Sequence, residues 1–354
     1  MTRLTLLTEI PAPYRIPLFN ALAKRVELKV IFLAARHQQR PYRRHESELA
    51  FSRLVLPHRD VTIAGRWLVL NRGIREALVG SDVVLIGGWN QPAFWQALVW
   101  AKARRVPVIA WVESTERDRR SARFEPMKRS VVRLIDAFLV PGRASYAYLR
   151  SLGIENDRIT TAPNAVDRAL FETALADGGH MRTRPLVLAV GRLAPEKGLD
   201  VLLRATSDLP VDVALAGVGP EERSLRALAG QNVRFLGQVD RDELADLYAN
   251  ADVLALPSRS ETWGMVLNEA ALAGLPLVAS DAAGAAYELV VDGENGFRVP
   301  ADDVGALREA LRRLTEDPEL RARFGARSRE IGAGYSPEAW ADAVAGLCMS
   351  FARH

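Results

Sequence analysis

The stretch that decides the fold reads Leu186-Val-Leu-Ala-Val-Gly191-Arg192-Leu-Ala-Pro195-Glu-Lys197-Gly198. Its first five residues are apolar without a break, which is typical of a strand buried on both faces of a parallel sheet. A glycine ends this run, and a loop with two cations follows. Open α/β sheets bind ligands beyond the carboxyl ends of their strands, so we expect Arg192 and Lys197 to meet a ligand there. An ordinary solvent-exposed loop is the alternative interpretation.

The lysine in this loop is unusual for the chain. Lys197 is the only lysine after Lys128 in a sequence that otherwise uses arginine. An ammonium group is a compact point charge, whereas guanidinium is a planar fork. A lysine at this position therefore favours a phosphate as the ligand.

Ten further apolar runs of the same kind occur along the chain. They cover residues 4–7, 28–33, 83–86, 108–112 and 137–140 in the first half, and 213–216, 233–236, 253–256, 277–279 and 296–299 in the second. Helical patterns, such as those over 199–206 and 304–314, lie between them. This alternation predicts α/β domains with doubly wound parallel sheets and right-handed crossovers. A length of 354 residues suits two such domains.

A second informative stretch is Val253-Leu-Ala-Leu-Pro257-Ser258-Arg-Ser-Glu261-Thr-Trp263-Gly264-Met265-Val266-Leu-Asn-Glu269. The pattern predicts a buried strand that ends at Pro257 and a helix that begins near Gly264. The first N–H groups of that helix, on Gly264, Met265 and Val266, together with its dipole would bind a diphosphate.

Two carboxylates flank this predicted anion site. Glu261 precedes the helix, and Glu269 lies about 7–8 Å along the helix axis from Gly264. Carboxylates accept hydrogen bonds from sugar hydroxyls, so the pair suits two hydroxylated rings joined by a diphosphate. For Glu269, a solvated helix-face glutamate is the alternative interpretation.

Several motifs in a fixed order resemble glycosyltransferase family 4, the retaining nucleotide-sugar enzymes of GT-B fold. They are Gly191-Arg192…Lys197-Gly198, Gly217-Val-Gly219-Pro220-Glu, Val233-x-Phe-x-Gly237-Gln238-Val239, Glu261-x7-Glu269 and Asn268-Glu-Ala-x3-Gly274-x-Pro276. The resemblance is close over about residues 185–300 and looser before them.

The resemblance implies two Rossmann-like domains that face a cleft. Residues 1–168 would form the acceptor-binding domain and residues 180–335 the nucleotide-sugar domain. The helix predicted over 336–354 would pack back on the first domain.

The resemblance also implies roles for individual residues. Arg192 and Lys197 would neutralise the donor diphosphate, Glu261 would hold the donor sugar, and Glu269 would hold the ribose. The remaining donor-binding positions would be backbone or loop groups at Gly191, Gly217, Gly237, Gln238, Val239, Ser258, Gly264, Met265 and Val266. Such enzymes need neither a metal ion nor a cofactor, and the leaving phosphate itself takes the acceptor's proton.

The first half departs from the family pattern at two places. The loop after the first strand is rich in proline where many relatives have glycines, and Arg15 in this loop is a candidate for contacting donor or acceptor. Glu113 occupies the position at which many relatives carry a histidine. It could take the acceptor's proton, or it could make a structural hydrogen bond.

Charge is unevenly distributed. Residues 1–170 contain 28 Lys and Arg against 15 Asp and Glu, and the remainder contains 19 against 28. Basic residues gather at positions 117, 119, 120, 123, 128, 129 and 133. This stretch predicts a helix on an anionic membrane surface or a grip for an acidic acceptor, with core packing as the alternative interpretation. For the basic first half as a whole, a solvated surface without a partner is the alternative. We expect no nucleic-acid partner.

The sequence shows no apolar run of about 20 residues and no signal-peptide pattern. Its single cysteine fits a reducing compartment. These features predict a cytoplasmic enzyme, with the inner membrane face as an alternative location.

The sequence therefore predicts a metal-independent retaining glycosyltransferase that acts on a lipid-linked, polysaccharide or other glycoconjugate acceptor. The alternatives are a glycosyltransferase of a soluble natural product, a sugar-nucleotide epimerase or oxidoreductase of similar fold, and a non-catalytic sugar-binding protein. The oxidoreductase lacks support because no strand leads into a G-x-G-x-x-G motif.

Overall fold

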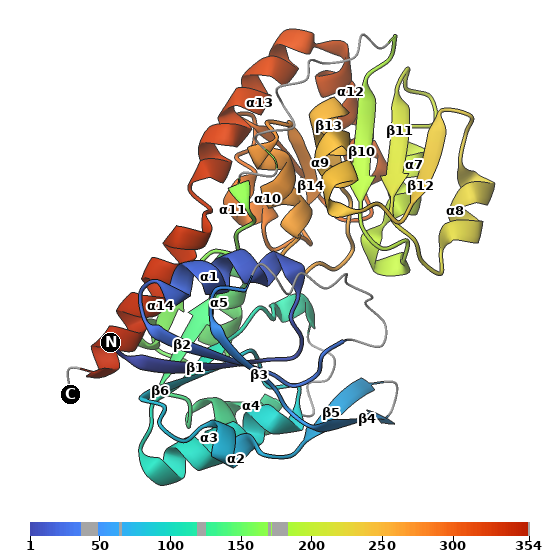
Figure 1. Cartoon of the computed structure of the whole chain (residues 1–354). Helices are drawn as coiled ribbons and strands as arrows, with labels where there is room; N and C mark the ends of the chain where they lie inside the picture. Colours follow the sequence, from blue (N-terminus) through green and yellow to red (C-terminus); the bar gives the residue numbers. More distant parts are fainter. Residues whose placement is uncertain (37–48, 64–65, 119–124, 169–170, 172–182, 353–354) are drawn as a thin grey trace. The chain divides into compact units, whose positions relative to one another are not determined.

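The computed structural model describes residues 1–36, 49–63, 66–118, 125–168, 171 and 183–352 (Figure 1). The chain divides into two compact units. The first consists of Met1–Pro141, Ser145–Val166 and Pro337–His354, and the second of Gly142–Ala144 and Asp167–Ser336. Each unit has its own sheet and its own buried core.

The first unit is built on a parallel sheet with strand order β3-β2-β1-β6-β7-β8-β9. Its central strands are buried, as expected for apolar runs without alternation. The strands are β1 (Arg3–Thr8), β2 (Glu27–Phe32), β3 (Ser52–Val55), β6 (Val83–Ile86), β7 (Val108–Trp111), β8 (Ala137–Val140) and β9 (Ile159–Thr161). A separate antiparallel hairpin is formed by β4 (His58–Ile63) and β5 (Arg66–Asn71).

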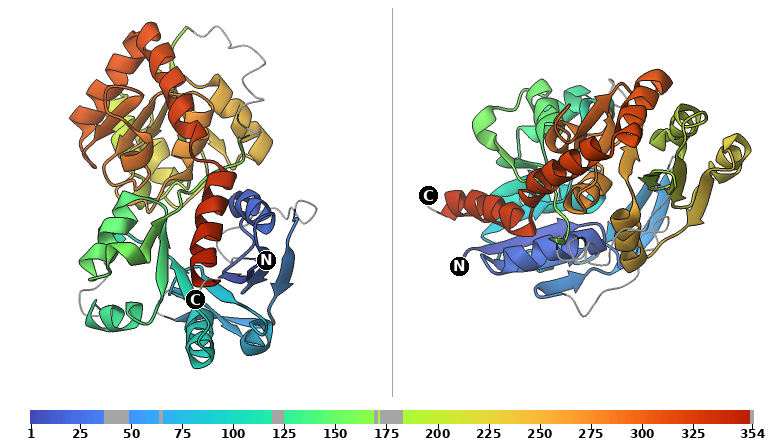
Figure 2. Two further views of the ribbon diagram at one scale, coloured as in Figure 1. Left: turned by 90° about the vertical axis from the view of Figure 1, so that its left-hand side faces the viewer. Right: turned by 90° about the horizontal axis from the view of Figure 1, so that it is seen from above.

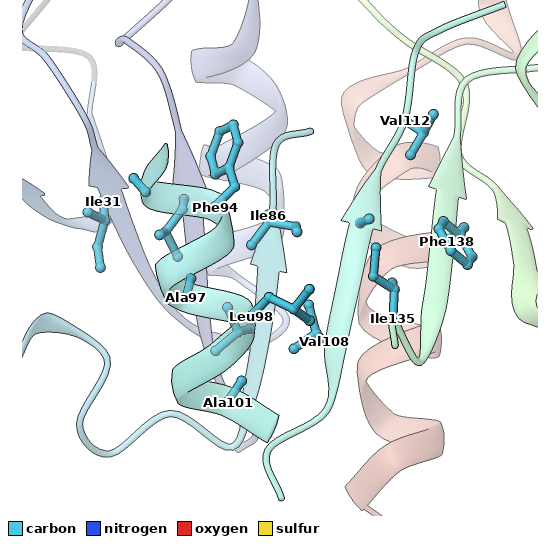
Figure 3. Close-up of a cluster of buried hydrophobic side chains, with 14 of the residues drawn as sticks. Ile31, Ile86, Phe94, Ala97, Leu98, Ala101, Val108, Val112, Ile135 and Phe138 are labelled. Atoms are coloured by element: carbon cyan, nitrogen blue, oxygen red, sulfur yellow. The ribbon is translucent and has the colours of Figure 1, made fainter. Parts of the chain in front are cut away.

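Helices cover both faces of this sheet. On one face, α1 and α14 pack over β1, and the Trp340 ring lies 5.1 Å from the Trp111 ring. On the opposite face, α3 buries Phe94, Ala97 and Leu98 (Figure 3). The helices of this unit are η1 (Pro13–Arg15), α1 (Ile16–Ala23), α2 (Ile74–Ala77), α3 (Pro92–Arg104), η3 (Glu116–Asp118), α4 (Glu125–Val132), α5 (Arg143–Ser151), η5 (Asn156–Arg158) and α14 (Pro337–Ala352). The first two residues of α5 belong to the second unit.

The second unit repeats the plan with strand order β12-β11-β10-β13-β14-β15, again parallel throughout. Its strands are β10 (Leu186–Val190), β11 (Asp212–Ala216), β12 (Val233–Gly237), β13 (Val253–Leu256), β14 (Leu277–Ser280) and β15 (Gly296–Val299). Its helices are η7 (Pro195–Lys197), α7 (Leu199–Ala205), α8 (Glu222–Leu228), α9 (Arg241–Asn250), α10 (Met265–Leu272), α11 (Ala286–Leu289), α12 (Val304–Glu316) and α13 (Pro318–Ala333). The core of one face is formed by α7, α12 and α13 (Figure 2).

All the predicted strands are present, and their ends agree with the predictions within one residue. The predicted fold class is therefore confirmed: both units are Rossmann-like α/β domains with doubly wound parallel sheets. The sequence did not predict β3, β4, β5 and β9. Of these, β3 is exposed along its length, and β9 has only three residues.

Each sheet has one point at which the strand order reverses. In the first unit, β2 and β3 lie on one side of β1 and β6 lies on the other. In the second unit, β11 and β12 lie on one side of β10 and β13 lies on the other. At such a point the chain leaves two adjacent strands in opposite directions, and a crevice opens at the carboxyl edge of the sheet. Folds of this kind bind their ligands there.

Candidate active site

The switch point of the second unit brings together three predicted site residues. Lys197 Nζ donates a hydrogen bond to Glu261 Oε2, and both side chains are mostly buried. A Cβ placed on Gly191 would lie 3.5 Å from Lys197 Cε, so the glycine at the end of β10 borders the same pair. A cation and a carboxylate from two different loops are thus in direct contact beyond β10.

Close backbone packing holds these loops together. A Cβ on Gly198 would lie 2.2 Å from Pro257 O, so no larger residue fits where the lysine loop meets the loop after β13. A Cβ on Gly217 would lie 1.9 Å from Gly191 O, and the Gly217 N–H donates to Gly237 O at 2.7 Å. Gly217 therefore allows the neighbouring strand ends to approach closely, and its N–H bonds to Gly237.

Arg259 clamps the same two loops, and the sequence analysis missed it. Its guanidinium donates to both carboxylate oxygens of Asp200 at 2.8 and 2.9 Å, and to Pro195 O at 2.9 Å. Its Nε also donates to Asp302 Oδ1 at 2.6 Å. The hydrogen bond from Arg259 lowers the pKa of Asp200 despite partial burial. The clamp fixes both ends of the loop that carries Lys197.

The start of α10 adjoins Glu261. Gly264 has a φ of 101°, which favours glycine, and a Cβ there would lie 3.4 Å from Glu261 Cγ and 2.9 Å from Leu256 Cδ2. Met265 and Val266 form the first turn, whose N–H groups have no acceptor within the helix. These donors lie next to Glu261 in the chain fold and suit an anion.

Ser258 is fully buried at the end of β13, and its hydroxyl has no hydrogen-bond partner among the residues that the structure describes. Its carbonyl oxygen accepts a hydrogen bond from Ser280 Oγ. A buried hydroxyl without a partner costs free energy, so this atom is a candidate contact for a ligand.

Glu269 is held by a residue that the sequence analysis did not single out. The Tyr248 hydroxyl donates to Glu269 Oε2 at 2.6 Å, and the Tyr248 side chain is fully buried. Burial, then the adjacent carboxylate, raises the pKa of Tyr248 well above its usual value, so the phenol remains a donor. Glu269 thus pairs with Tyr248, whereas Glu261 pairs with Lys197.

Three predicted residues lie outside this cluster. Arg192 is more than half exposed and donates to Glu196 within its own loop. Burial alone would raise the pKa of Glu196, but the hydrogen bond from Arg192, a backbone hydrogen bond and the charges of Arg192 and Lys197 together lower it. Gln238 is exposed and Val239 is partly exposed after β12. The structure shows no contact between these residues and Lys197.

Arg15 and Glu113 meet in the first unit. Arg15 Nη2 donates to Glu113 Oε1 at 3.4 Å, and Arg15 Nη1 donates to Thr8 Oγ1 at 3.0 Å. The Arg15 guanidinium also lies over the Trp111 ring, 4.4 Å from its centroid. Asn164 Nδ2 donates to the same Glu113 oxygen at 3.2 Å. The structural hydrogen bond considered for Glu113 is therefore present, at the carboxyl edge of the sheet.

The basic segment is only partly described. Residues 119, 120 and 123 lie outside the described residues, and so does the side chain of Lys128. Arg117, Arg129 and Arg133 are exposed, whereas Val132 and Ile135 are buried in the core. Val132 and Ile135 thus serve packing, whereas Leu134 faces solvent together with the cations.

The described residues contain neither a cluster of metal-ligating side chains nor a membrane-spanning helix. No group of three or more His, Cys, Asp or Glu side chains there could hold a metal ion. No helix in the same residues has the length and apolar character needed to cross a bilayer.

Comparisons with known proteins bear on both halves of the chain. Residues 171–331 match the family described as Glycosyl transferases group 1, and residues 18–170 match Glycosyltransferase Family 4.

The chain is similar to a phosphatidyl-myo-inositol mannosyltransferase of Mycolicibacterium smegmatis, with 34% identity over 70% of this chain and 66% of that protein. It is also similar to a D-inositol 3-phosphate glycosyltransferase of Xylanimonas cellulosilytica, with 32% identity over 72% of this chain and 68% of that protein. The chain thus spans about two thirds of the length of these relatives.

Among solved structures, Anabaena Alr3699/HepE in complex with UDP-glucose superposes with a TM-score of 0.78 at 19% identity, covering 99% of this chain and 100% of that one. WaaG, a glycosyltransferase involved in lipopolysaccharide biosynthesis, superposes with a TM-score of 0.68 at 18% identity, covering 98% and 99%. These likenesses support the GT-B type of fold. The family matches and the two relatives show that this chain belongs to glycosyltransferase family 4.

Proposed function

We propose that the chain transfers a sugar from a nucleotide-diphosphate sugar to a lipid-linked, polysaccharide or other glycoconjugate acceptor, with retention at the anomeric carbon. The observation that carries this proposal is the Lys197–Glu261 pair beside the first turn of α10. A cation, helix N–H groups and a hydroxyl-accepting carboxylate are what a sugar diphosphate requires.

In this proposal the diphosphate takes the place of Glu261 at Lys197. The ammonium group then neutralises charge on the leaving phosphate, with the N–H groups of Met265 and Val266 as further donors. Glu261, released from the ion pair, accepts hydrogen bonds from the hydroxyls of the donor sugar. Glu269, oriented by Tyr248, accepts those of the ribose.

The chemical step requires no protein nucleophile. The bond between the anomeric carbon and the phosphate oxygen breaks while the acceptor oxygen bonds to the same face of that carbon. The acceptor's proton passes to the leaving phosphate oxygen. Catalysis then rests on positioning and on preorganised charge, without a metal ion.

The names of the relatives support this class of reaction. One is named for mannosyl transfer to phosphatidyl-myo-inositol and another for glycosyl transfer to D-inositol 3-phosphate. UDP-glucose is bound in one of the similar structures. A lipid-linked acceptor also fits the exposed cations Arg117, Arg129 and Arg133, which suit an anionic membrane at the cytoplasmic face. Flotation with phosphatidylglycerol vesicles at low salt, and release at high salt, would test that location.

Calorimetry with UDP, GDP and the corresponding nucleosides tests the donor site. Lys197→Ala should weaken binding of the diphosphate at least tenfold and leave nucleoside binding unchanged, because only the diphosphate contacts the ammonium group. Lys102→Ala is the matched control, since Lys102 also pairs with a carboxylate, Asp136, but in the first unit. Equal losses of affinity for the nucleoside and the nucleoside diphosphate would show that Lys197 does not bind the phosphates.

A further inference from the structure

The loops after β1 and β6 lie at the switch point of the first unit. In the second unit, the loops after β10 and β13 hold the corresponding position. The two switch points differ in chemistry. The second unit carries Lys197 and Glu261 there. The first unit carries Glu9 directly after β1, and Asn90 and Gln91 after β6.

The Glu9 carboxylate is held through one oxygen. Asn90 Nδ2 donates to Glu9 Oε1 at 2.7 Å, and Gln91 Nε2 donates to the same atom at 2.8 Å. The side chain is partly exposed, and no hydrogen bond to Oε2 is found in the described part of the chain. One oxygen is thus fixed while the other can accept from a ligand.

Gln91 makes this arrangement rigid. Its side chain is 1% exposed, and its Oε1 accepts from the Val69 N–H at 2.9 Å. Because that bond fixes which end of the amide is oxygen, the NH2 group is left to donate to Glu9. A buried side chain anchored on the backbone of β5 therefore orients a carboxylate at the carboxyl edge of the sheet.

Two glycines allow the loop after β6 to come this close to β1. A Cβ on Gly87 would lie 3.0 Å from Leu7 O, and Gly88 has a φ of 130°. Larger residues would force this loop away from β1, and Asn90 and Gln91 with it.

A second carboxylate lies two strands away at the same edge. Arg15 donates to Thr8, the neighbour of Glu9, and to Glu113 after β7, so one guanidinium spans the strand ends between the two acids. The groups joined by these hydrogen bonds are thus carboxylates, amides and a hydroxyl, with Arg15 as a cation that is already paired. Such a set suits hydroxyl groups, which both donate and accept, better than a phosphate.

We propose that this edge is a subsite for an uncharged, hydroxyl-rich ring, a hexose or a cyclitol, and that Glu9 selects it by accepting a hydrogen bond from a ring hydroxyl at Oε2. The assignment deepens the proposed function, since the ring would be the acceptor or the acceptor's terminal unit. Asn90 and Gln91 are positioning residues for Glu9.

The test uses myo-inositol and methyl α-D-glucopyranoside as probes of the full chain in saturation-transfer NMR. We expect at least one polyol to bind, and Glu9→Gln to weaken its Kd about tenfold, because a charged acceptor is replaced by a neutral amide. Asn90→Ala, which removes one of the two bonds to Oε1, should weaken it by a smaller factor. The matched control is Glu27→Gln, an exposed glutamate at the opposite edge of the same sheet, which should change nothing.

Three results would overturn the assignment: no polyol binds the wild-type protein, Glu9→Gln binds as the wild type does, or Glu27→Gln weakens binding equally. UDP and GDP are titrated into the same samples, and polyol binding is measured with and without them. If polyol binding is absent from the wild type, or does not depend on Glu9, while nucleotides bind normally, the subsite alone is rejected. Absence of nucleotide binding beside a Glu9-dependent polyol signal rejects the proposed function alone.

Discussion

Tyr248 is a fully buried residue that orients a side chain proposed to bind the ligand. Its hydroxyl orients Glu269, and its ring packs against Phe171, 5.7 Å between centroids. Removing the hydroxyl leaves the packing in place and releases only the carboxylate.

We therefore expect Tyr248→Phe to weaken nucleotide binding about threefold to tenfold and to lower the free energy of unfolding by about 1 kcal/mol. Calorimetry with UDP or GDP and urea unfolding measure the two effects. Tyr335→Phe is the matched control, because Tyr335 donates to the Glu288 carbonyl oxygen instead. It should cost stability without changing nucleotide affinity. Unchanged affinity in Tyr248→Phe would contradict the ribose role of Glu269.

Two of the predicted site glycines allow the energetic cost of backbone crowding to be compared with that of backbone strain. Gly217→Ala would place a Cβ 1.9 Å from Gly191 O, whereas Gly237→Ala would meet nothing within 4 Å. Both have positive φ, at 146° and 72°. We expect Gly237→Ala to cost about 1 kcal/mol from strain alone, and Gly217→Ala to cost about 2–4 kcal/mol because β10 and β11 must separate. Urea unfolding curves compare them, and equal losses would show that crowding at Gly217 is unimportant.

At the scale of elements, the Arg259 clamp links η7 to the loop after β13. Arg259→Ala should cost about 1–2 kcal/mol of stability and also weaken diphosphate binding, because Lys197 and Glu261 would lose their fixed separation. Arg312→Ala is the control, since Arg312 also pairs with two acids but on the exposed face of α12. It should change neither quantity measurably. A variant that lost stability but bound UDP or GDP normally would limit Arg259 to a structural role.

The same clamp makes a pH-dependent contribution. Since the pKa of Asp200 is lowered in the folded chain, its contribution is complete above the ordinary carboxyl pKa of about 4 and is lost as the pH falls through the lowered value. The stability difference between wild type and Arg259→Ala should therefore be constant from pH 5 to 7 and shrink below about pH 4.

Elements buried on both faces were predictable from sequence because they read as unbroken apolar runs. The strands β3 and β4 were not, since their residues are largely exposed and polar residues interrupt the pattern. Strand β5 was missed although residues 67–70 form an unbroken apolar run and Val69 is buried. The predicted site residues were found through motifs, which mark loops after strands. Arg259, Tyr248 and Gln91 act through partners 59, 21 and 22 residues away in the chain, and no local pattern reports such contacts.

At the scale of the whole molecule, the first unit is completed by the last helix. The chain leaves this unit at Val166 and returns at Pro337, and α14 buries Trp340, Val344 and Cys348 against the sheet. One face of the core therefore depends on residues about 170 positions further along the chain. Contacts of such long sequence separation slow folding, because the loop must close before they stabilise anything.

Cys348 makes the docking of α14 measurable. It is the only cysteine in the sequence and is fully buried, and burial raises the pKa of its thiol to about 12. Thiolate is the reactive form, so at pH 8 the folded chain should react with a disulfide reagent far more slowly than free cysteine does. Labelling then reports the opening of α14. Trp340→Ala, which removes the largest buried side chain of α14 itself, should cost about 3–5 kcal/mol and accelerate labelling at least tenfold. Met349→Ala, next to Cys348 but half-exposed, should leave the rate unchanged. Equal acceleration by both substitutions would mean that α14 opens by local fraying, and rapid labelling of the wild type would mean that α14 does not form a stable part of this core.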